Sequence, residues 1–277
     1  MVQFHNFSET AQRFFGATLL LPLIAGFWFS PILAHVMFLI ISVLMSREFG
    51  EMTGLNRLPM VLLQVLTGLA NLWPFIAAIY NWTEQIMFVF AIGLALIGKI
   101  GLSLLTTTRQ ISNFGFLMIM CVASGSAMLA LPEGRFLILA LALVIASCDS
   151  AAYFVGRVVG GPRLAPAISP NKTISGALGG MLATLLVSAL LFGPETVIDL
   201  QFYILGEKVM LSWVQVISGG LVIGFSSQLG DLLESALKRR LGLKDSSQLI
   251  PGHGGVLDRF DGYLLTLPTM FLFFMLI

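Results

Sequence analysis

Apolar runs long enough to cross a lipid bilayer follow one another along almost the whole chain. A spanning helix needs about 20 mostly apolar residues. The composition agrees with such helices, because 57% of the residues are hydrophobic, only 10% are charged, and the mean hydropathy is +0.94. The sequence therefore predicts an all-α, polytopic transmembrane helical bundle and excludes a soluble domain.

Nine candidate spans follow from these runs. The segment ahead of the first run has no basic n-region and no small-residue cleavage site, which argues against a removable signal peptide. Only Ser30 and Pro31 separate the first two runs, which predicts a tight helical hairpin. The spans are expected near residues 14–29, 31–46, 58–79, 86–105, 114–131, 136–156, 174–193, 209–229 and 262–277.

The basic residues divide unevenly between the two sides of this arrangement. Lys and Arg are retained on the cytoplasmic side of membrane proteins. With a cytoplasmic N-terminus, only Arg135 and Lys208 of the 15 basic residues fall on the far side. The sequence therefore predicts a cytoplasmic N-terminus and places both polar motif regions, residues 157–173 and 231–261, on the cytoplasmic side. The other 13 basic residues are Arg13, Arg47, Arg57, Lys99, Arg109, Arg157, Arg163, Lys172, Lys238, Arg239, Arg240, Lys244 and Arg259.

The chain is expected to form one membrane domain over residues 1–277. Residues 1–145 are a run of apolar helices, and residues 146–277 hold the polar motifs, including a signature at 235–261. Cys121 and Cys148 both lie in apolar runs and are interpreted as small packing residues, not as a disulfide. The charged residues Arg47, Glu48 and Glu51, at the end of the second run, are expected to form a solvated cluster.

The segment from Ser226 to Gly262 is the only long polar stretch, and it carries charges of both signs. If its start continues the eighth span as a helix, Asp231 and Lys238 share one face with Glu234 or Ser235 between them. Such a face offers metal ligands together with a cation. The alternative is a solvated helix end at which Glu234 and Lys238 form an ordinary i,i+4 pair.

A glycine run, Pro-Gly-His-Gly-Gly at residues 251–255, lies later in this segment. Proline and glycine disfavour a helix, and glycine N–H groups can cradle phosphate oxygens because no Cβ obstructs their approach. Asp258, Arg259 and Asp261 follow at once, at the mouth of the last run. We therefore expect both aspartates to point toward the site that Asp231 faces.

A third polar group lies between residues 149 and 176. Asp149 is near the cytoplasmic end of the sixth run, and an ionisable residue inside a span is a candidate for function; the alternative is that it caps its helix or pairs with Arg157. Arg157, Lys172 and Thr173 are expected on the same side and can bind phosphates, Arg in a bidentate manner and Lys as a point charge.

The ordered string S235-x2-K-R-x4-K-D-x5-P-G-H-G-G-x2-D-R-x-D resembles the signature of the phosphatidate cytidylyltransferase (CDP-diacylglycerol synthase) family. The resemblance is strong from residue 146 onward. It implies the reaction of CTP with phosphatidate to give CDP-diacylglycerol and pyrophosphate. It also implies that Asp231 and Asp258 bind the metal, with Asp261 as a further candidate ligand. The family usually has Lys-Lys-Thr followed shortly by Glu, whereas this chain has Asn171 and Ser175 at two of those positions.

Together, the motifs and the resemblance predict the site and its partners. The expected partners are CTP, phosphatidate, Mg²⁺ with a second cation as an option, the lipid bilayer and a second copy of the chain in a homodimer; no nucleic acid is expected. The expected location is a bacterial inner (plasma) membrane. The catalytic candidates are Asp231, Asp258, Lys172, Lys238, Arg239 and Lys244, and the substrate-binding candidates are Arg157, Thr173, His253, Gly254, Gly255, Arg259 and Asp149.

Two other functions remain as alternatives. One is a different lipid-phosphate transferase or a CTP-dependent lipid kinase. The other is a transporter that uses Asp149 and Asp231 as ion sites, but a transporter places such residues near mid-span and here they crowd the helix ends. A CDP-alcohol phosphotransferase is excluded, because its D-G-x2-A-R motif is absent after Asp261 and Gly262.

Overall fold

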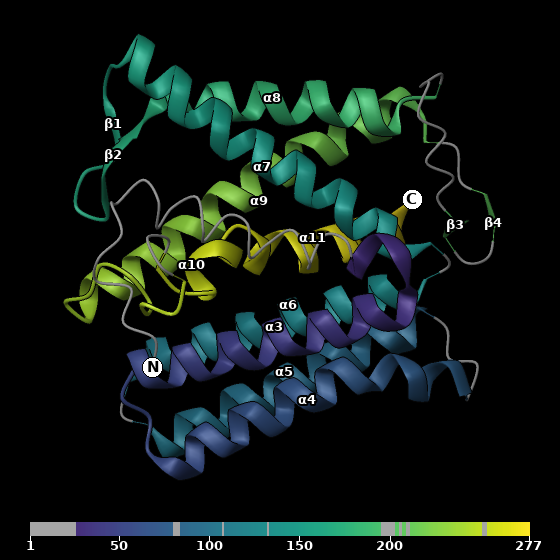
Figure 1. Ribbon diagram of the computed structural model, residues 1–277, viewed down its shortest axis with the longest axis vertical. Helices are drawn as coiled ribbons and strands as arrows, with labels where there is room; N and C mark the ends of the chain where they lie inside the picture. Colours follow the sequence, from purple (N-terminus) through teal and green to yellow (C-terminus); the bar gives the residue numbers. More distant parts are fainter. Residues whose placement is uncertain are drawn as a thin grey trace.

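The computed structural model describes residues 26–79, 84–106, 108–131, 133–194, 203–204, 207–208, 211–250 and 254–277. These residues form a helical bundle with very little strand (Figure 1). Seven of the helices are long and apolar enough to cross a membrane. They are α3 (Pro31–Met52), α4 (Arg57–Ile79), α5 (Glu84–Leu105), α6 (Arg109–Ala130), α7 (Gly134–Val159), α8 (Ile174–Phe192) and α9 (Trp213–Arg240).

The all-α, polytopic bundle predicted from the sequence is thus confirmed, whereas the number of nine spans stays a prediction. Most of the first expected span lies outside the described residues. The last expected span is a helix of only 14 residues, α11 (Tyr263–Leu276), which follows the single turn of α10 (Leu257–Phe260). The second span begins as expected from its sequence, because Ser30 caps α3 and Pro31 occupies its first turn.

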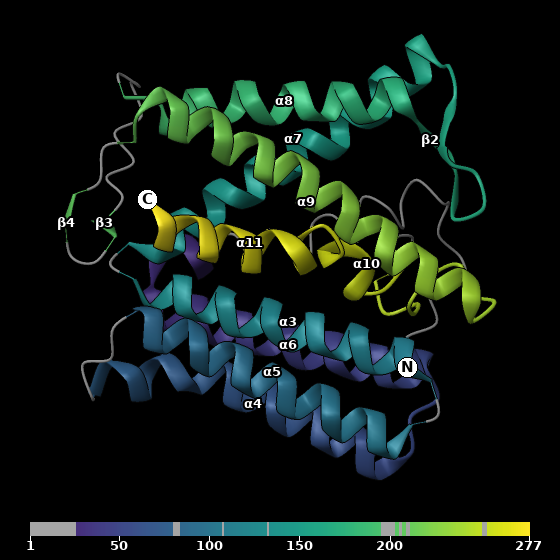
Figure 2. The same cartoon turned by 180° about the vertical axis from the view of Figure 1, so that it is seen from behind.

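The helices lie in two groups that α11 joins. Helices α3 to α6 form one group, and α7, α8 and α9 form the other (Figures 1 and 2). Helix α11 packs against both α6 and α9. Helix α6 is the most buried of the seven, with 78% of its apolar window inside the protein, so it forms the centre of the first group. The polar motifs of residues 146–277 lie on the other group, α7 to α9, and on α10.

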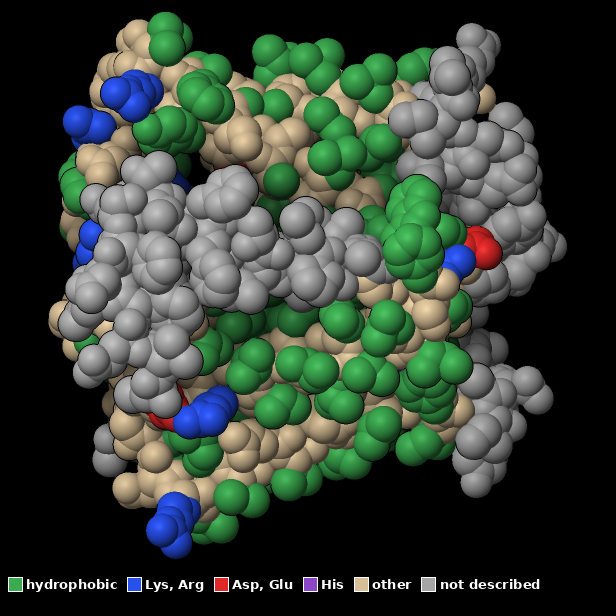
Figure 3. Space-filling model, in the orientation of Figure 1, with side chains coloured by type: hydrophobic (Ala, Val, Ile, Leu, Met, Phe, Trp, Pro, Cys, Tyr) green, Lys and Arg blue, Asp and Glu red, His purple; other side chains and the backbone are tan. Residues whose placement is uncertain are grey.

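On the face that Figure 3 shows, hydrophobic side chains are spread over the described surface between the two ends of the bundle, and charged side chains are scarce there. Large hydrophobic side chains in the middle part of helices, such as Ile97 of α5 and Leu182 of α8, are both 58% exposed. In that view most of the Lys and Arg side chains gather at the end that carries β1 (Arg163–Ala165), β2 (Ser169–Thr173) and α10. An apolar belt with charges at its ends is the surface expected of a protein in a bilayer. We call the end with β1, β2 and α10 the polar end; the β3 (Tyr203–Ile204) and β4 (Glu207–Lys208) pair lies at the other.

Helices α7 and α8 cross in close contact beside the polar end. A Cβ added to Gly176 would lie 2.5 Å from the carbonyl oxygen of Ala152, and one added to Gly180 would lie 3.0 Å from that of Cys148. These glycines therefore pack helices within the chain. In the segment of sequence that connects α7 to α8, β1 and β2 form an antiparallel hairpin that the sequence analysis did not predict. The hairpin ends at Thr173, whose hydroxyl accepts from Gly176 N–H and caps α8.

Candidate active site

An ion pair at the polar end of α9 joins two segments that are distant in the sequence. Lys172, at the end of β2, places its Nζ 2.5 Å from Asp231 Oδ2. Ser235, one turn further along α9, donates to Asp231 Oδ1 at 3.2 Å. The two charged side chains are 30% and 25% exposed, so the pair is reached by solvent from one side. Lys172 thus supplies the positive charge that a carboxylate at this depth needs.

This ion pair lines an open cavity of about 640 Å³ bordered by α7, α8, α9 and the β1–β2 hairpin. A volume of this size is typical of a small-molecule site. Asp149 and Arg157 of α7 lie in its wall, and Arg157 donates to the hydroxyl of Tyr153 at 2.9 Å. The structure therefore brings together five sequence-predicted residues around one cavity: Asp149, Arg157, Lys172, Thr173 and Asp231.

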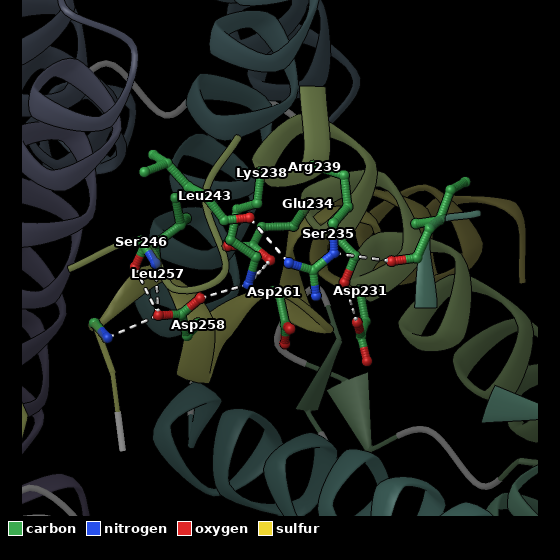
Figure 4. Close-up of polar contacts among 12 residues, drawn as sticks. Asp231, Glu234, Ser235, Lys238, Arg239, Leu243, Ser246, Leu257, Asp258 and Asp261 are labelled. Carbon is green, nitrogen blue, oxygen red and sulfur yellow. Dashed lines mark hydrogen bonds and ion pairs between the residues drawn. The ribbon is translucent and has the colours of Figure 1, made fainter. Parts of the chain in front are cut away.

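A second, buried cluster lies one turn further along α9. Lys238 Nζ lies 2.5 Å from both Glu234 Oε2 and Asp258 Oδ1 (Figure 4). Glu234 is fully buried, and the side chains of Lys238 and Asp258 are 9% and 7% exposed. The i,i+4 pair of Glu234 and Lys238 exists, but the alternative of a solvated helix end is wrong, because the pair is buried against α10. Lys238 therefore ties the end of α9 to α10.

The carboxylate of Asp258 is also the hub of the segment from residue 246 to residue 257, which we call the signature loop. Its Oδ2 accepts from Ser246 N–H at 2.9 Å, from Ser246 Oγ at 2.9 Å and from Gly255 N–H at 2.7 Å. Burial alone would raise the pKa of Asp258, but the bond from Lys238 and the N–H bonds from Gly255 and Ser246 together lower it below its usual value. Asp258 is therefore held as a carboxylate.

The two glycines of the loop that the structure describes have identifiable structural roles. Gly254 has a φ of +81°, and a Cβ there would lie 2.6 Å from Asp258 Oδ2. Gly255 gives its N–H to Asp258. The phosphate-binding role expected for this run stays a prediction, and a phosphate would compete with Asp258 for the Gly255 N–H. His253 lies outside the described residues.

Asp261 adds another carboxylate between the two clusters. Figure 4 shows its side chain pointing in the same direction as that of Asp231. Burial raises the pKa of Asp261 well above its usual value, and the nearby charges of Asp231, Glu234 and Asp149 raise it further, against a hydrogen bond from Gly262 N–H. This convergence of negative charge suits a hard cation, whose preferred ligands are carboxylate oxygens.

The fit to Mg²⁺ is better for Asp231 and Asp261 than for Asp258. All three carboxylates already accept hydrogen bonds. Asp258 would have to release the buried Lys238 or the loop N–H groups to coordinate a cation. Asp231 would have to release only the side chains of Lys172 and Ser235 in a partly exposed pair, and Asp261 accepts from Gly262 N–H through one oxygen. Within the described part of the chain, no three His, Cys, Asp or Glu side chains are already grouped at ligand spacing. The metal pair of Asp231 and Asp258 stays a prediction.

Three other predicted cations do not line the cavity, although the charge of Arg259 acts on Asp149 in its wall. Arg239 is exposed and donates to the carbonyl oxygens of Ile168 and Leu243, at 3.3 and 3.0 Å, so it attaches the end of α9 to the β1–β2 hairpin. Lys244 and Arg259 are exposed at the same polar end. They can add positive potential near the cavity, but they are not among the residues that line it.

The sequence analysis missed one buried acid of the site, Glu48. Only part of the solvated cluster expected near it exists, because Arg47 and Glu51 form an exposed pair at 2.7 Å while Glu48 is 4% exposed. Its carboxylate accepts hydrogen bonds from the signature loop. A signal was present, since Glu48 follows the buried Met45 by three residues on the inner face of α3.

Comparisons with known proteins identify the family of the chain. The model of the cytidylyltransferase family matches residues 11–277. A phosphatidate cytidylyltransferase of Brucella suis biovar 1 (strain 1330) is 36% identical over 234 residues, which cover 72% of this chain and 80% of the relative. One from Bacillus subtilis (strain 168) is 33% identical over 245 residues, which cover 83% of this chain and 85% of the relative. The chain therefore belongs to the cytidylyltransferase family of nucleotidyltransferases.

Proposed function

We propose that the chain transfers a cytidylyl group from CTP to phosphatidate, giving CDP-diacylglycerol and pyrophosphate in phospholipid biosynthesis. The observation that carries the proposal is the cavity at the polar end, which is lined by Arg157 and by the ion pair of Lys172 and Asp231. Two polyanionic substrates must meet in such a site, and the basic side chains would neutralise their phosphates. The names of the relatives support this choice of substrates.

In this reaction an oxygen of the lipid phosphate attacks the α-phosphorus of CTP. The bond from that phosphorus to the β-phosphate oxygen breaks, and pyrophosphate leaves with the electron pair. No general base is needed, because a phosphate monoester is already ionised near pH 7. Lys172 would orient the CTP phosphates.

We further propose that Mg²⁺ binds among Asp231, Asp261 and Asp258, and that the polar end faces the cytoplasm of a bacterial plasma membrane. When bound, Mg²⁺ neutralises charge on the transferring and leaving phosphates. The basic residues at the polar end support the orientation. A homodimer remains an expectation of the family resemblance alone.

The test is to incubate the purified protein with Mg²⁺, a panel of lipid phosphates and CTP that carries its label at either the α- or the γ-phosphorus. We expect α-label in a lipid product only when phosphatidate is present. Lipid that acquires the γ-label would instead show a CTP-dependent lipid kinase. Transfer of neither label would refute the proposed activity.

A further inference from the structure

We propose that Glu48 is a positioning residue of the active site, whose carboxylate ties the two ends of the signature loop together and so sets the place of Asp258. Only the activity measurement below rests on the proposed function. Glu48 is contributed by α3, in the N-terminal helices, while the loop lies between α9 and α11 (Figure 1). The inference therefore gives the N-terminal region a defined part in the site.

The contacts of Glu48 form what we call the loop latch. Oε1 accepts from Ser247 Oγ at 2.6 Å and from Val256 N–H at 2.9 Å. Oε2 accepts from Leu257 N–H at 2.8 Å and lies 3.2 Å from Ser246 Oγ. Each oxygen thus contacts one hydroxyl from the start of the loop and one backbone N–H from its end. A buried carboxylate is costly unless its oxygens are hydrogen-bonded, and here both are.

This pattern requires a carboxylate. In a Glu48→Gln variant the side-chain NH2 must replace one of the two oxygens. Whichever way the amide is turned, the NH2 then faces the N–H of either Val256 or Leu257, donor against donor. The serine hydroxyls can rotate to accept, but the backbone N–H groups cannot. One buried N–H is left unsatisfied.

The loop latch is connected to Lys238 of α9 through Asp258. Ser246 Oγ lies 2.9 Å from Asp258 Oδ2 and 3.2 Å from Glu48 Oε2, so it contacts both carboxylates and its single proton is donated to one or shared between them. A Cβ on Gly255 would lie 2.6 Å from Glu48 Oε2, which means that this glycine leaves the space that the latch occupies. Asp258 in turn holds Lys238. A shift of the loop therefore moves Asp258 and Lys238, while the Lys172–Asp231 pair stays in place on β2 and α9.

The experiment compares the Glu48→Gln and Glu48→Ala variants with the matched control Glu51→Gln. Glu51 lies on the same helix, but its side chain is 53% exposed and pairs with Arg47. We expect kcat for each folded Glu48 variant to fall by about 10–100-fold, since a small displacement of a catalytic group has an effect of this size. KM for CTP should change by less than about threefold, because the cavity residues are intact. The control should match the wild type.

Hydrogen exchange supplies a second measurement that needs no activity. In both Glu48 variants the peptide that covers residues 254–260 should exchange faster, while peptides of α6 exchange as in the wild type. If Glu48→Ala does not fold, the isosteric Glu48→Gln variant still tests the positioning role of Glu48. Wild-type kcat together with wild-type exchange at residues 254–260 in Glu48→Gln would overturn the proposal, and so would faster exchange that spreads equally to α6. If the wild type itself has no activity on CTP, the proposed function fails while the exchange comparison still tests the latch.

Discussion

Neutralising the two predicted metal ligands, Asp231 and Asp258, should have different consequences. Asp231→Asn removes a charge beside the cavity, where Lys172 is its main cationic partner. Asp258→Asn removes the buried hub that holds both Lys238 and the signature loop. We expect the first variant to lose activity while keeping its stability, and the second to lose both.

The size of each effect on stability follows from burial. Breaking a buried ion pair by removing one partner costs ~3–5 kcal/mol. Because Lys238 keeps Glu234 as a partner, we take the lower end of this range for Asp258→Asn. At this chain length that loss corresponds to a fall in Tm of about 10 °C. The Lys172–Asp231 pair is partly exposed, and such pairs contribute ~0–1 kcal/mol, which corresponds to a fall of at most a few degrees.

The two native cysteines allow the unfolding to be followed directly. Cys121 and Cys148 are 3% and 0% exposed, so a thiol-reactive fluorophore should label them only when the protein unfolds. Turnover of CTP is measured in parallel on the same preparations. Both variants should lose at least ~10²-fold in kcat, on the scale of several kcal/mol of charge stabilisation. A wild-type Tm in Asp258→Asn would refute the stabilising role of Asp258. Near-normal turnover in Asp231→Asn would refute the catalytic role of Asp231.

Three further predictions test the cavity, the backbone contacts and the topology. Lys172→Met should lower turnover at least tenfold, with an unchanged Tm, if Lys172 orients CTP phosphates; unchanged kcat and KM would contradict that role. Gly230→Ala should lower both turnover and Tm, because its Cβ would lie 2.6 Å from a carbonyl oxygen at the α10–α11 junction, whereas the control Gly93→Ala has no atom within 4 Å and should not lower either. Single cysteines at Glu133 and Leu249, in a background without native cysteines, should be labelled from opposite sides of the membrane, and labelling of both from one side would exclude the predicted orientation.

The sequence by itself determined the helical membrane fold and singled out most residues of the candidate site. Long apolar runs can satisfy their backbone groups in a bilayer by forming helices, so the helical class and the approximate positions of the seven long described helices follow from local composition. The polar residues stand out for the same reason, because charge next to a span is costly and rarely accidental. The Lys172, Asp231 and Asp258 positions could therefore be singled out without a structure.

Only the tertiary structure decided which charges meet. Lys172 pairs with Asp231 from 59 residues away, and Leu257 N–H reaches Glu48 from 209 residues away. Neither spacing has a period that a sequence pattern could reveal, because helix packing sets both distances. Glu48 was consequently assigned to a solvated cluster, although α3 turns it toward the signature loop. Burial behind packed helices is what turns an ordinary charged residue at a helix end into part of the site.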